Sequence, residues 1–387
     1  MQSSNFAHTR KIRVVHYCNQ LSLGGTERTM EIFCKYLDRS RFEVFAVSRM
    51  HRESLSKRAK VNLSAAIGVR AARAKKRLWS QMNARIPNFR AILGADHVLL
   101  AKNDEELHDL LLELSPDVLH VHYSGRAEPP TSDETVMSKI PAILTTNQFE
   151  LENTAPSHRL VSRMFFVSRW LLENKATWAA HDPRAEIFYN PVELPASTEN
   201  LRGELGIPAD AFVIGRVGRA DPGIHDPISL KAYAEIQGDS TWFLALSPPE
   251  NMIREARSMN LKNFVAISPT ADDARLSRFY NSIDVLAHAR RDGETFGCNL
   301  AEAMIHGKPV VSHLTPFMNA QLETVGEGGY VVAQEDWRAY SRHLKQLKED
   351  AAFRAELSLK AKRRALDQFE ARRLSDRLAG AYLALVK

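Results

Sequence analysis

The sequence predicts an α/β protein built from two doubly wound parallel sheets, one in each half of the chain. Short apolar runs alternate with helix-like stretches, a pattern typical of parallel sheets covered by helices on both faces. The alternation stops at residues 192–200, which lack periodicity and contain Pro195, and restarts at residue 212. The length of 387 residues also fits two domains. We therefore expect two α/β domains whose sheets face each other across a cleft.

The first half opens with a short apolar run that predicts a buried strand, followed by the turn Leu23-Gly24-Gly25. Thr26 is the expected N-cap of the next helix, because apolar residues then recur at helical spacing. A second helix is expected near residues 104–114. The strands expected in this half are 12–17, 42–47, 118–121, 142–146, 165–168 and 186–189.

The second half repeats the same alternation. Its last third is mostly helical, and a final helix is expected around residues 372–386. The strands expected in this half are 212–217, 242–246, 264–267, 285–287 and 310–312.

The composition excludes several classes of protein. Hydrophobic residues make up 44% and charged residues 25%, which supports sizeable cores and argues against wholesale disorder. No apolar run approaches the roughly 20 residues that cross a bilayer, and the first residues lack the apolar core of a secretory signal. Cys18, Cys34 and Cys298 are far apart, which argues against a disulfide scaffold or a structural zinc site. We expect a cytoplasmic protein.

The positive charge is concentrated in one insert at residues 49–90. The insert contains twelve Lys and Arg residues and one acidic residue, so its net charge is +11. Because the whole chain has a net charge of +6, the rest of the chain has a net charge of −5. One interpretation is a solvated helical face. The other is contact with an anionic membrane or a polyanionic acceptor. Nucleic acid is not an expected partner, because Trp79 and Phe89 are the insert's only aromatic residues.

The most informative stretch is residues 284–311, which predicts a strand, a glycine-containing loop, a helix at about 299–306 and another strand. Glu294 in the loop and Glu302 in the helix are separated by seven residues. The helix start favours an anion such as a pyrophosphate. The carboxylate of Glu302 suits the vicinal hydroxyls of a ribose. Taken alone, the pair is equally explained as a solvated loop acid and a surface helix acid.

This segment resembles the E-x7-E signature of retaining glycosyltransferases of the GT-B fold, especially glycosyltransferase family 4. The flanking E-T-F-G, A-E-A-M and G-K-P-V-V match as well, and the resemblance extends from about residue 12 to the C-terminus. It implies two Rossmann-like domains: an acceptor-binding domain over 1–192 and a nucleotide-sugar-binding domain over 201–369. A linker at 193–200 joins them, and a C-terminal helix at 370–387 crosses back to the first domain.

The resemblance also implies roles for individual residues. Glu294 would lie by the donor sugar and Glu302 would bind the ribose. Gly24 and Gly25 would contact the donor phosphates and the acceptor side, although without the other motifs a simple tight turn is the favoured explanation. The donor-binding loop and helix start would comprise Thr295, Phe296, Gly297, Cys298 and Asn299.

His122 follows the expected strand 118–121 and matches the histidine that lies near the transferred sugar in the family. The carboxyl ends of strands are where α/β sheets bind their ligands. His120 is interpreted as facing the other side of the strand and packing in the core.

Arg216 and Arg219 match the cations that stabilise the leaving diphosphate in the family, where a guanidinium binds phosphate bidentately. Ile224 stands near the position of the family's usual lysine. His225 and Lys231 are the candidate substitutes, and the alternative is that one of the two arginines binds the diphosphate alone.

The implied function is retaining transfer of a sugar from a nucleotide-sugar, UDP- or GDP-linked, to a glycan, lipid-linked or other hydroxyl acceptor in polysaccharide or glycolipid biosynthesis. No D-x-D motif and no carboxylate–histidine set at metal spacing is present, so neither a metal nor a cofactor is expected. Peripheral contact with the cytoplasmic membrane face through 49–90 is a further expectation. The alternatives are a binding protein with a degenerate GT-B site, and a GT-B relative such as a sugar-nucleotide epimerase. A dinucleotide fingerprint is absent, which weighs against an NAD enzyme.

Overall fold

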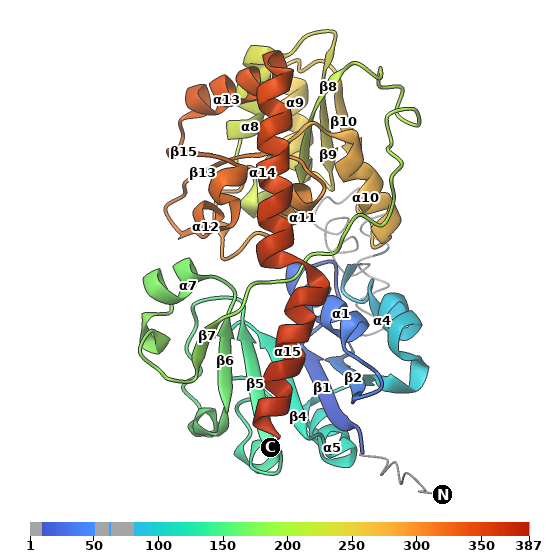
Figure 1. The fold of residues 1–387 in the computed structure, drawn as a ribbon, viewed down its shortest axis with the longest axis vertical. Helices are drawn as coiled ribbons and strands as arrows, with labels where there is room; N and C mark the ends of the chain where they lie inside the picture. Colours follow the sequence, from blue (N-terminus) through green and yellow to red (C-terminus); the bar gives the residue numbers. More distant parts are fainter. Residues whose placement is uncertain (1–9, 51–61, 63–80, 387) are drawn as a thin grey trace, which may run out of the picture. The chain divides into compact units, whose positions relative to one another are not determined.

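The structure is a computed structural model, and it describes residues 10–50, 62 and 81–386 (Figure 1). The chain forms two compact units. Of the described residues, the first unit contains 10–22, 26–50, 62, 81–165 and 375–386, and the second contains 23–25 and 166–374. One large sheet lies mostly in the first unit, and the other lies in the second. Across the described part of the chain, no helix combines the length and the apolar character needed to span a membrane.

The first sheet has the strand order β3-β2-β1-β4-β5-β6-β7. The pairs β1–β2, β2–β3, β1–β4 and β4–β5 are parallel. The order reverses between β1 and β4, where α/β sheets place their ligands beyond the carboxyl ends of the strands. The strands are β1 (Ile12–Cys18), β2 (Phe42–Arg49), β3 (Val98–Ala101), β4 (Val118–Tyr123), β5 (Ala142–Asn147), β6 (Arg163–Phe166) and β7 (Ala185–Ile187).

The second sheet has the order β10-β9-β8-β11-β13-β15, and every neighbouring pair is parallel. Its order reverses between β8 and β11, which places a second switch point there. A separate two-stranded sheet pairs β12 with β14. The strands are β8 (Phe212–Val217), β9 (Thr241–Leu246), β10 (Phe264–Ile267), β11 (Val285–Ala287), β12 (Gly293–Glu294), β13 (Val310–His313), β14 (Met318–Asn319) and β15 (Gly329–Val332).

Helices connect the strands of both sheets. The α-helices of the first half are α1 (Gly25–Tyr36), α4 (Ile86–Leu93), α5 (Asp104–Leu114), α6 (Glu134–Met137) and α7 (Arg169–Asn174). Those of the second half are α8 (Ile228–Ile236), α9 (Glu250–Ser258), α10 (Asp273–Ser282), α11 (Cys298–Ile305), α12 (Gln321–Val325), α13 (Trp337–Glu349), α14 (Ala351–Phe369) and α15 (Ala371–Leu385). Short 3-10 helices are η1 (Ala95–His97), η2 (Pro156–Leu160), η3 (Thr177–Ala179), η4 (Pro222–Ile224) and η5 (Gly326–Gly328).

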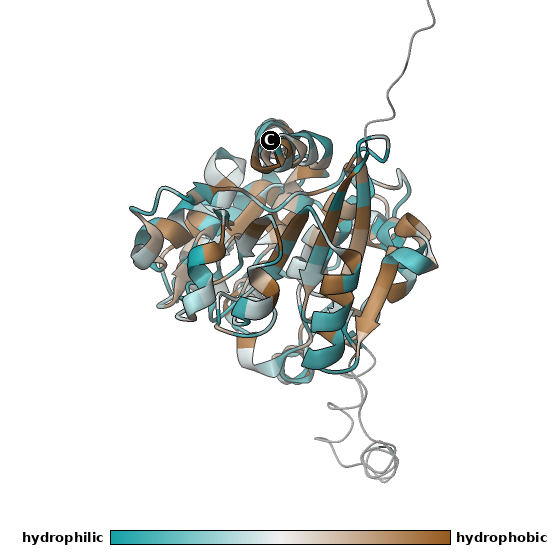
Figure 2. Cartoon of the chain, turned by 90° about the horizontal axis from the view of Figure 1, so that it is seen from below, coloured by the Kyte–Doolittle hydropathy of each residue, from teal (hydrophilic) through white to brown (hydrophobic). Residues whose placement is uncertain are grey.

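Each core is formed around strands that are largely buried on both faces. Figure 2 shows brown, hydrophobic residues along the strands and a mixture of brown and teal on the helices. In β4 all six residues are buried, as expected for a strand covered by helices on both sides. In the second unit, β8, β9 and β11 pack with α8 and α13 around Tyr233 and Tyr340.

The α/β class with parallel sheets is confirmed. The bounds of α5, β8, β10 and β11 agree with the sequence-based ranges. Thr26 was expected as an N-cap, but α1 begins at Gly25, so Thr26 lies inside the first turn. The sequence did not predict β3, β15 or the β12–β14 pair. Most of the basic insert at 49–90 lies outside the described residues.

Candidate functional site

Glu294 lies in the two-residue strand β12, where the preceding position can be occupied only by a glycine. Gly293 has φ +69°, and a Cβ atom there would come within 1.7 Å of the carbonyl oxygen of Met318. The carbonyl of Glu294 accepts a hydrogen bond from the backbone N–H of Ala320 at 3.0 Å. The loop after β11 is therefore fixed against β14, which sets the position of the Glu294 side chain.

The segment after Glu294 turns sharply into α11. Gly297 is the N-cap, with φ +91°, and a Cβ there would meet the side chain of Leu300 at 2.6 Å. Asn299 donates its side-chain amide to the carbonyl of Val217 at 3.1 Å, which ties the start of α11 to the end of β8. Phe296 is buried, with its ring centroid 5.1 Å from that of Phe369. Thr295, Cys298 and Asn299 are partly exposed around this turn.

Glu294 is buried among cations and stays ionised. His288 lies 2.9 Å from one of its carboxylate oxygens and Arg290 lies 3.4 Å from the other. Burial would raise the pKa of Glu294, but the charge of Arg290 and the hydrogen bond from His288 outweigh burial and lower the pKa to about 2. An ionised carboxylate only accepts hydrogen bonds, so His288 donates through Nε2 while its Nδ1 faces Ser312 at 2.8 Å. Glu294 can therefore accept bonds from sugar hydroxyls or stabilise positive charge, but it cannot supply a proton at neutral pH.

Arg216 is a buried cation whose hydrogen-bonding capacity is only partly used by the residues that the structure describes. It lies in β8 with 3% exposure. Its Nη1 has no hydrogen-bond partner among the described residues. Burial, with the nearby charge of Arg290, lowers the pKa of Arg216 to about 10, and Glu294 partly offsets this. At neutral pH Arg216 is still charged, so the protein retains a buried positive charge with unused donor capacity.

The other sequence-predicted cations differ from Arg216 in their surroundings. Arg219 is exposed, and its charge contributes to the lowered pKa of Glu294. His225 is buried and lies 2.7 Å from a carboxylate oxygen of Glu255. Lys231 is exposed on α8, and Ile224 is buried in η4.

Arg290 and His288 are the members of this site that sequence reasoning missed. Besides contacting Glu294, Arg290 donates two hydrogen bonds to the carboxylate of Asp292, from Nε at 2.5 Å and from Nη2 at 2.8 Å. Both residues stand directly upstream of Glu294 in the A-H-A-R-R-D-G-E segment. Their position just after β11, at the switch point of the second sheet, was the available signal.

Glu302 lies on α11, eight residues after Glu294 in the chain. Its carboxylate accepts a hydrogen bond from the hydroxyl of Tyr280 at 2.8 Å. The hydroxyl of Tyr280 also reaches the carbonyl of Asn299 at 3.3 Å. Tyr280 thus orients Glu302 relative to the start of α11.

The glycine turn follows β1. Gly25 is exposed and begins α1. Glu27, on the first turn of α1, accepts hydrogen bonds from the side chains of Ser22 at 2.6 Å and Gln20 at 3.0 Å. These bonds hold the residues on both sides of Gly24 in place.

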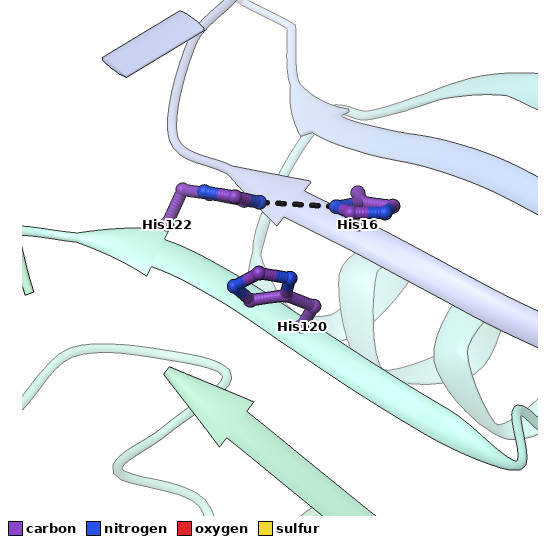
Figure 3. A group of neighbouring side chains, drawn as sticks. All are labelled: His16, His120 and His122. Atoms are coloured by element: carbon purple, nitrogen blue, oxygen red, sulfur yellow. Dashed lines mark hydrogen bonds between the residues drawn. The ribbon is translucent and has the colours of Figure 1, made fainter. Parts of the chain in front are cut away.

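His122 is buried at the end of β4 and does not stand alone. Its Nε2 lies 3.0 Å from Nδ1 of His16 in β1 (Figure 3). The interpretation that His120 faces the other side of the strand is wrong, because residues two apart in a strand share a face. The ring centroids of His120 and His122 are 4.1 Å apart. His120 is fully buried, as expected.

Within the described residues, one group of three possible metal-ligating side chains occurs, namely His16, His120 and His122. It lies in the first sheet, apart in sequence from the Glu294 loop. Two of the three rings already point nitrogens at each other at hydrogen-bond distance.

A family model matches the second half of the chain, and solved structures superimpose on nearly all of it. Residues 197–364 match the family model described as "Glycosyl transferases group 1". The structure superimposes on that of Anabaena HepE in complex with UDP and glucose with a TM-score of 0.68 and 14% identity, over 96% of this chain and all of that one. The chain has the GT-B fold.

Curated sequence relatives of this GT-B chain include glycosyltransferases. A D-inositol 3-phosphate glycosyltransferase of Kineococcus radiotolerans is 27% identical over 185 residues, 42% of each protein. The capsular polysaccharide biosynthesis glycosyltransferase CapM of Staphylococcus aureus is 28% identical over 188 residues, 46% of this chain and 47% of CapM. The matched regions thus span less than half the length of these two relatives.

Proposed function

We propose that the protein is a retaining, nucleotide-sugar-dependent glycosyltransferase. The donor binds in the second unit, around the Glu294 loop, the start of α11 and Arg216. The match of residues 197–364 to group 1 glycosyltransferases and the UDP and glucose bound by HepE support this proposal. The relatives' names, which mention inositol 3-phosphate and capsular polysaccharide, support a glycan or other hydroxyl acceptor, and a lipid-linked acceptor stays a proposal from the sequence.

The buried and incompletely bonded guanidinium of Arg216 is the observation that carries the proposal. Leaving a buried charged donor unpaired costs free energy, so such a group is retained where a ligand completes it. We take that anion to be a diphosphate, because Arg216, Arg219 and Arg290 all lie near enough to Glu294 for their charges to interact with it, and three cations suit a multiply charged anion. These cations would stabilise the leaving nucleoside diphosphate, while ionised Glu294 would hold hydroxyls of the sugar.

We assign donor binding to residues 201–369 and acceptor binding to residues 1–192. The segment 193–200 would link these domains, and the helix at 370–387 would return to the first. The glycine turn at Gly24 and Gly25 and the histidine His122 belong to the acceptor-side domain and would complete the site. We also propose peripheral contact between residues 49–90 and an anionic membrane. This proposal is supported by the excess of Lys and Arg in that segment of the sequence.

A thermal-shift panel of UDP-, GDP- and ADP-sugars tests the proposal. Ligand binding raises the midpoint of unfolding by an amount set by RT ln(1 + [L]/Kd), so one nucleotide should stand out. We favour UDP or GDP. A panel in which no nucleotide-sugar changes the midpoint at millimolar concentration would contradict donor binding.

Glu302→Gln is expected to weaken donor binding about 10-fold or more, because an amide is a poorer acceptor than a carboxylate for two ribose hydroxyls. Calorimetric titration with the selected donor measures the effect. Glu349→Gln, at an exposed position of α13, is the matched control and should leave affinity unchanged. Equal affinity of Glu302→Gln and wild type would remove Glu302 from the ribose site.

EDTA-treated protein is expected to keep most of its turnover. The arginines near Glu294 and the start of α11 supply the positive charge that Mg²⁺ provides in metal-dependent transferases. The measurement is nucleoside diphosphate release before and after chelation. Loss of transfer with EDTA and its restoration by Mg²⁺ or Mn²⁺ would overturn this expectation.

A further inference from the structure

A continuous chain of hydrogen bonds runs through the core of the first unit. It links Thr146 of β5 to His122 of β4 through three intervening side chains. The donor–acceptor distances are 2.7 Å for Thr146 Oγ1 to His120 Nε2, 2.6 Å for His120 Nδ1 to the Tyr382 hydroxyl, 3.3 Å for that hydroxyl to His16 Nε2, and 3.0 Å for His16 Nδ1 to His122 Nε2. Tyr382 lies on α15, the last helix that the structure describes (Figure 1).

The four titratable side chains in this series of hydrogen bonds, namely Tyr382 and the three histidines, are neutral. Tyr382 and the three histidines are each at most 1% exposed. Burial lowers the pKa of His16 and His120 well below its usual value and lowers that of His122 to about 3. Burial also raises the pKa of Tyr382 well above its usual value. Each imidazole therefore carries one proton, and the tyrosine keeps its own.

Counting these protons restricts the tautomers. The hydroxyl of Tyr382 has one proton but bonds two histidines, so one histidine must donate to it and the other must accept from it. If Tyr382 donates to His16, every ring carries its proton on Nδ1. If Tyr382 donates to His120, every ring carries its proton on Nε2. The three histidines must therefore share one tautomer, and Tyr382 selects it.

Two features favour the Nε2–H arrangement. Hydrogen bonds donated by a hydroxyl are shorter than those donated by a ring N–H. The 2.6 Å contact therefore fits Tyr382 donating to His120, and the 3.3 Å contact fits His16 donating to Tyr382. Among the described residues, Nδ1 of His122 is buried without a partner. An unpaired acceptor is less costly there than an unpaired N–H donor.

We propose that Tyr382 of the C-terminal helix is a positioning residue, which acts through His16 to fix His122 in the Nε2–H tautomer with Nδ1 left as an acceptor for a substrate hydroxyl. The role of that acceptor rests on the proposed function, whereas the shared tautomer does not. Removing the hydroxyl of Tyr382 would release His16 and His122 to exchange between both tautomers. His122 would then present a donor in part of the molecules, which would bind the same hydroxyl less well.

A metal ion explains the three histidines less well. Both nitrogens of His120 are engaged by Thr146 and Tyr382. The facing nitrogens of His16 and His122 are 3.0 Å apart, whereas two ligands of a tetrahedral zinc ion lie about 3.3 Å apart.

The test is ¹⁵N NMR of the full-length protein labelled at histidine, with assignments from single histidine substitutions. We expect wild-type His16, His120 and His122 all to show a protonated Nε2. In Tyr382→Phe, His122 should become a mixture of tautomers, and kcat should fall about 3- to 10-fold with the donor KM unchanged. Tyr233→Phe removes another buried hydroxyl, from the second unit, and should leave the three signals and kcat as in wild type.

Opposite tautomers at His16 and His122 in wild type would overturn the proposal. So would unchanged histidine signals in Tyr382→Phe, or stoichiometric zinc in the purified protein. The expected spectra without any sugar transfer would support the shared tautomer and refute the proposed function, so the two failures are distinguishable.

Discussion

Arg216→Met is expected to lower kcat/KM for sugar transfer by about 10²–10³-fold, the usual loss for removing one electrostatic stabiliser of a transition state. It should do so without lowering the free energy of unfolding. Methionine fills similar space without the cost of a buried and incompletely paired charge. A loss of activity at unchanged or raised stability is the signature of a residue kept for its ligand.

Arg219→Met is the matched comparison, because Arg219 is exposed whereas Arg216 is buried. We expect a few-fold effect at Arg219. Steady-state kinetics and urea unfolding of both variants measure the difference. Equal and small kinetic effects would place the diphosphate elsewhere, and strong destabilisation by Arg216→Met would show that Arg216 has a structural role.

The stability of the protein is expected to fall steeply on acidification from pH 6.5 to 5. Burial lowers the pKa of His16, His120 and His122 in the folded state, so only the unfolded state binds protons in this range. The free energy of unfolding is thus highest above pH 6.5 and decreases as the pH falls toward the folded pKa values. The loss is roughly 1.4 kcal/mol per histidine per pH unit, or about 4 kcal/mol for three.

Glu294 does not contribute to the change in the free energy of unfolding between pH 6.5 and 5. Its pKa is lowered to about 2, so its contribution is present above its unfolded value near 4.5 and is lost only below it. Urea unfolding at several pH values gives the slope. His16→Asn should reduce proton uptake on unfolding by about one, whereas His181→Asn, at an exposed position, serves as the control. A stability that is flat between pH 7 and 5 would contradict the buried neutral cluster.

The strands and helices with strong local signals could be predicted from sequence. The apolar residues 212–214 at the start of β8 mark that strand locally. The Asn103 cap of α5, whose side chain accepts from the backbone N–H of Glu106, marks the helix. β3 and β15 have four residues each and are only partly buried, and β15 begins with a glycine. Their strand character comes from pairing with neighbours, which local pattern does not show.

Some residues of the candidate site could likewise be recognised from local sequence, whereas others could not. Glu294, Glu302 and the helix start lie in one segment with a recognisable spacing, so sequence alone singled them out. The connection of His122 to Tyr382 could not be predicted. His120 and Tyr382 are 262 positions apart, and the bond between them depends on how α15 packs against the first sheet. The cost of the unpaired nitrogen of Arg216 likewise appears only once its burial is known.

The most direct test of the central claim is the stoichiometry of a reaction with the selected nucleotide-sugar and a hydroxyl acceptor. Product analysis by NMR should show one nucleoside diphosphate released for each glycosidic bond formed, with the anomeric configuration of the donor retained. Conversion of the nucleotide-sugar into another nucleotide-sugar without an acceptor would indicate an epimerase and contradict the account. So would the absence of nucleoside diphosphate release from every donor that binds.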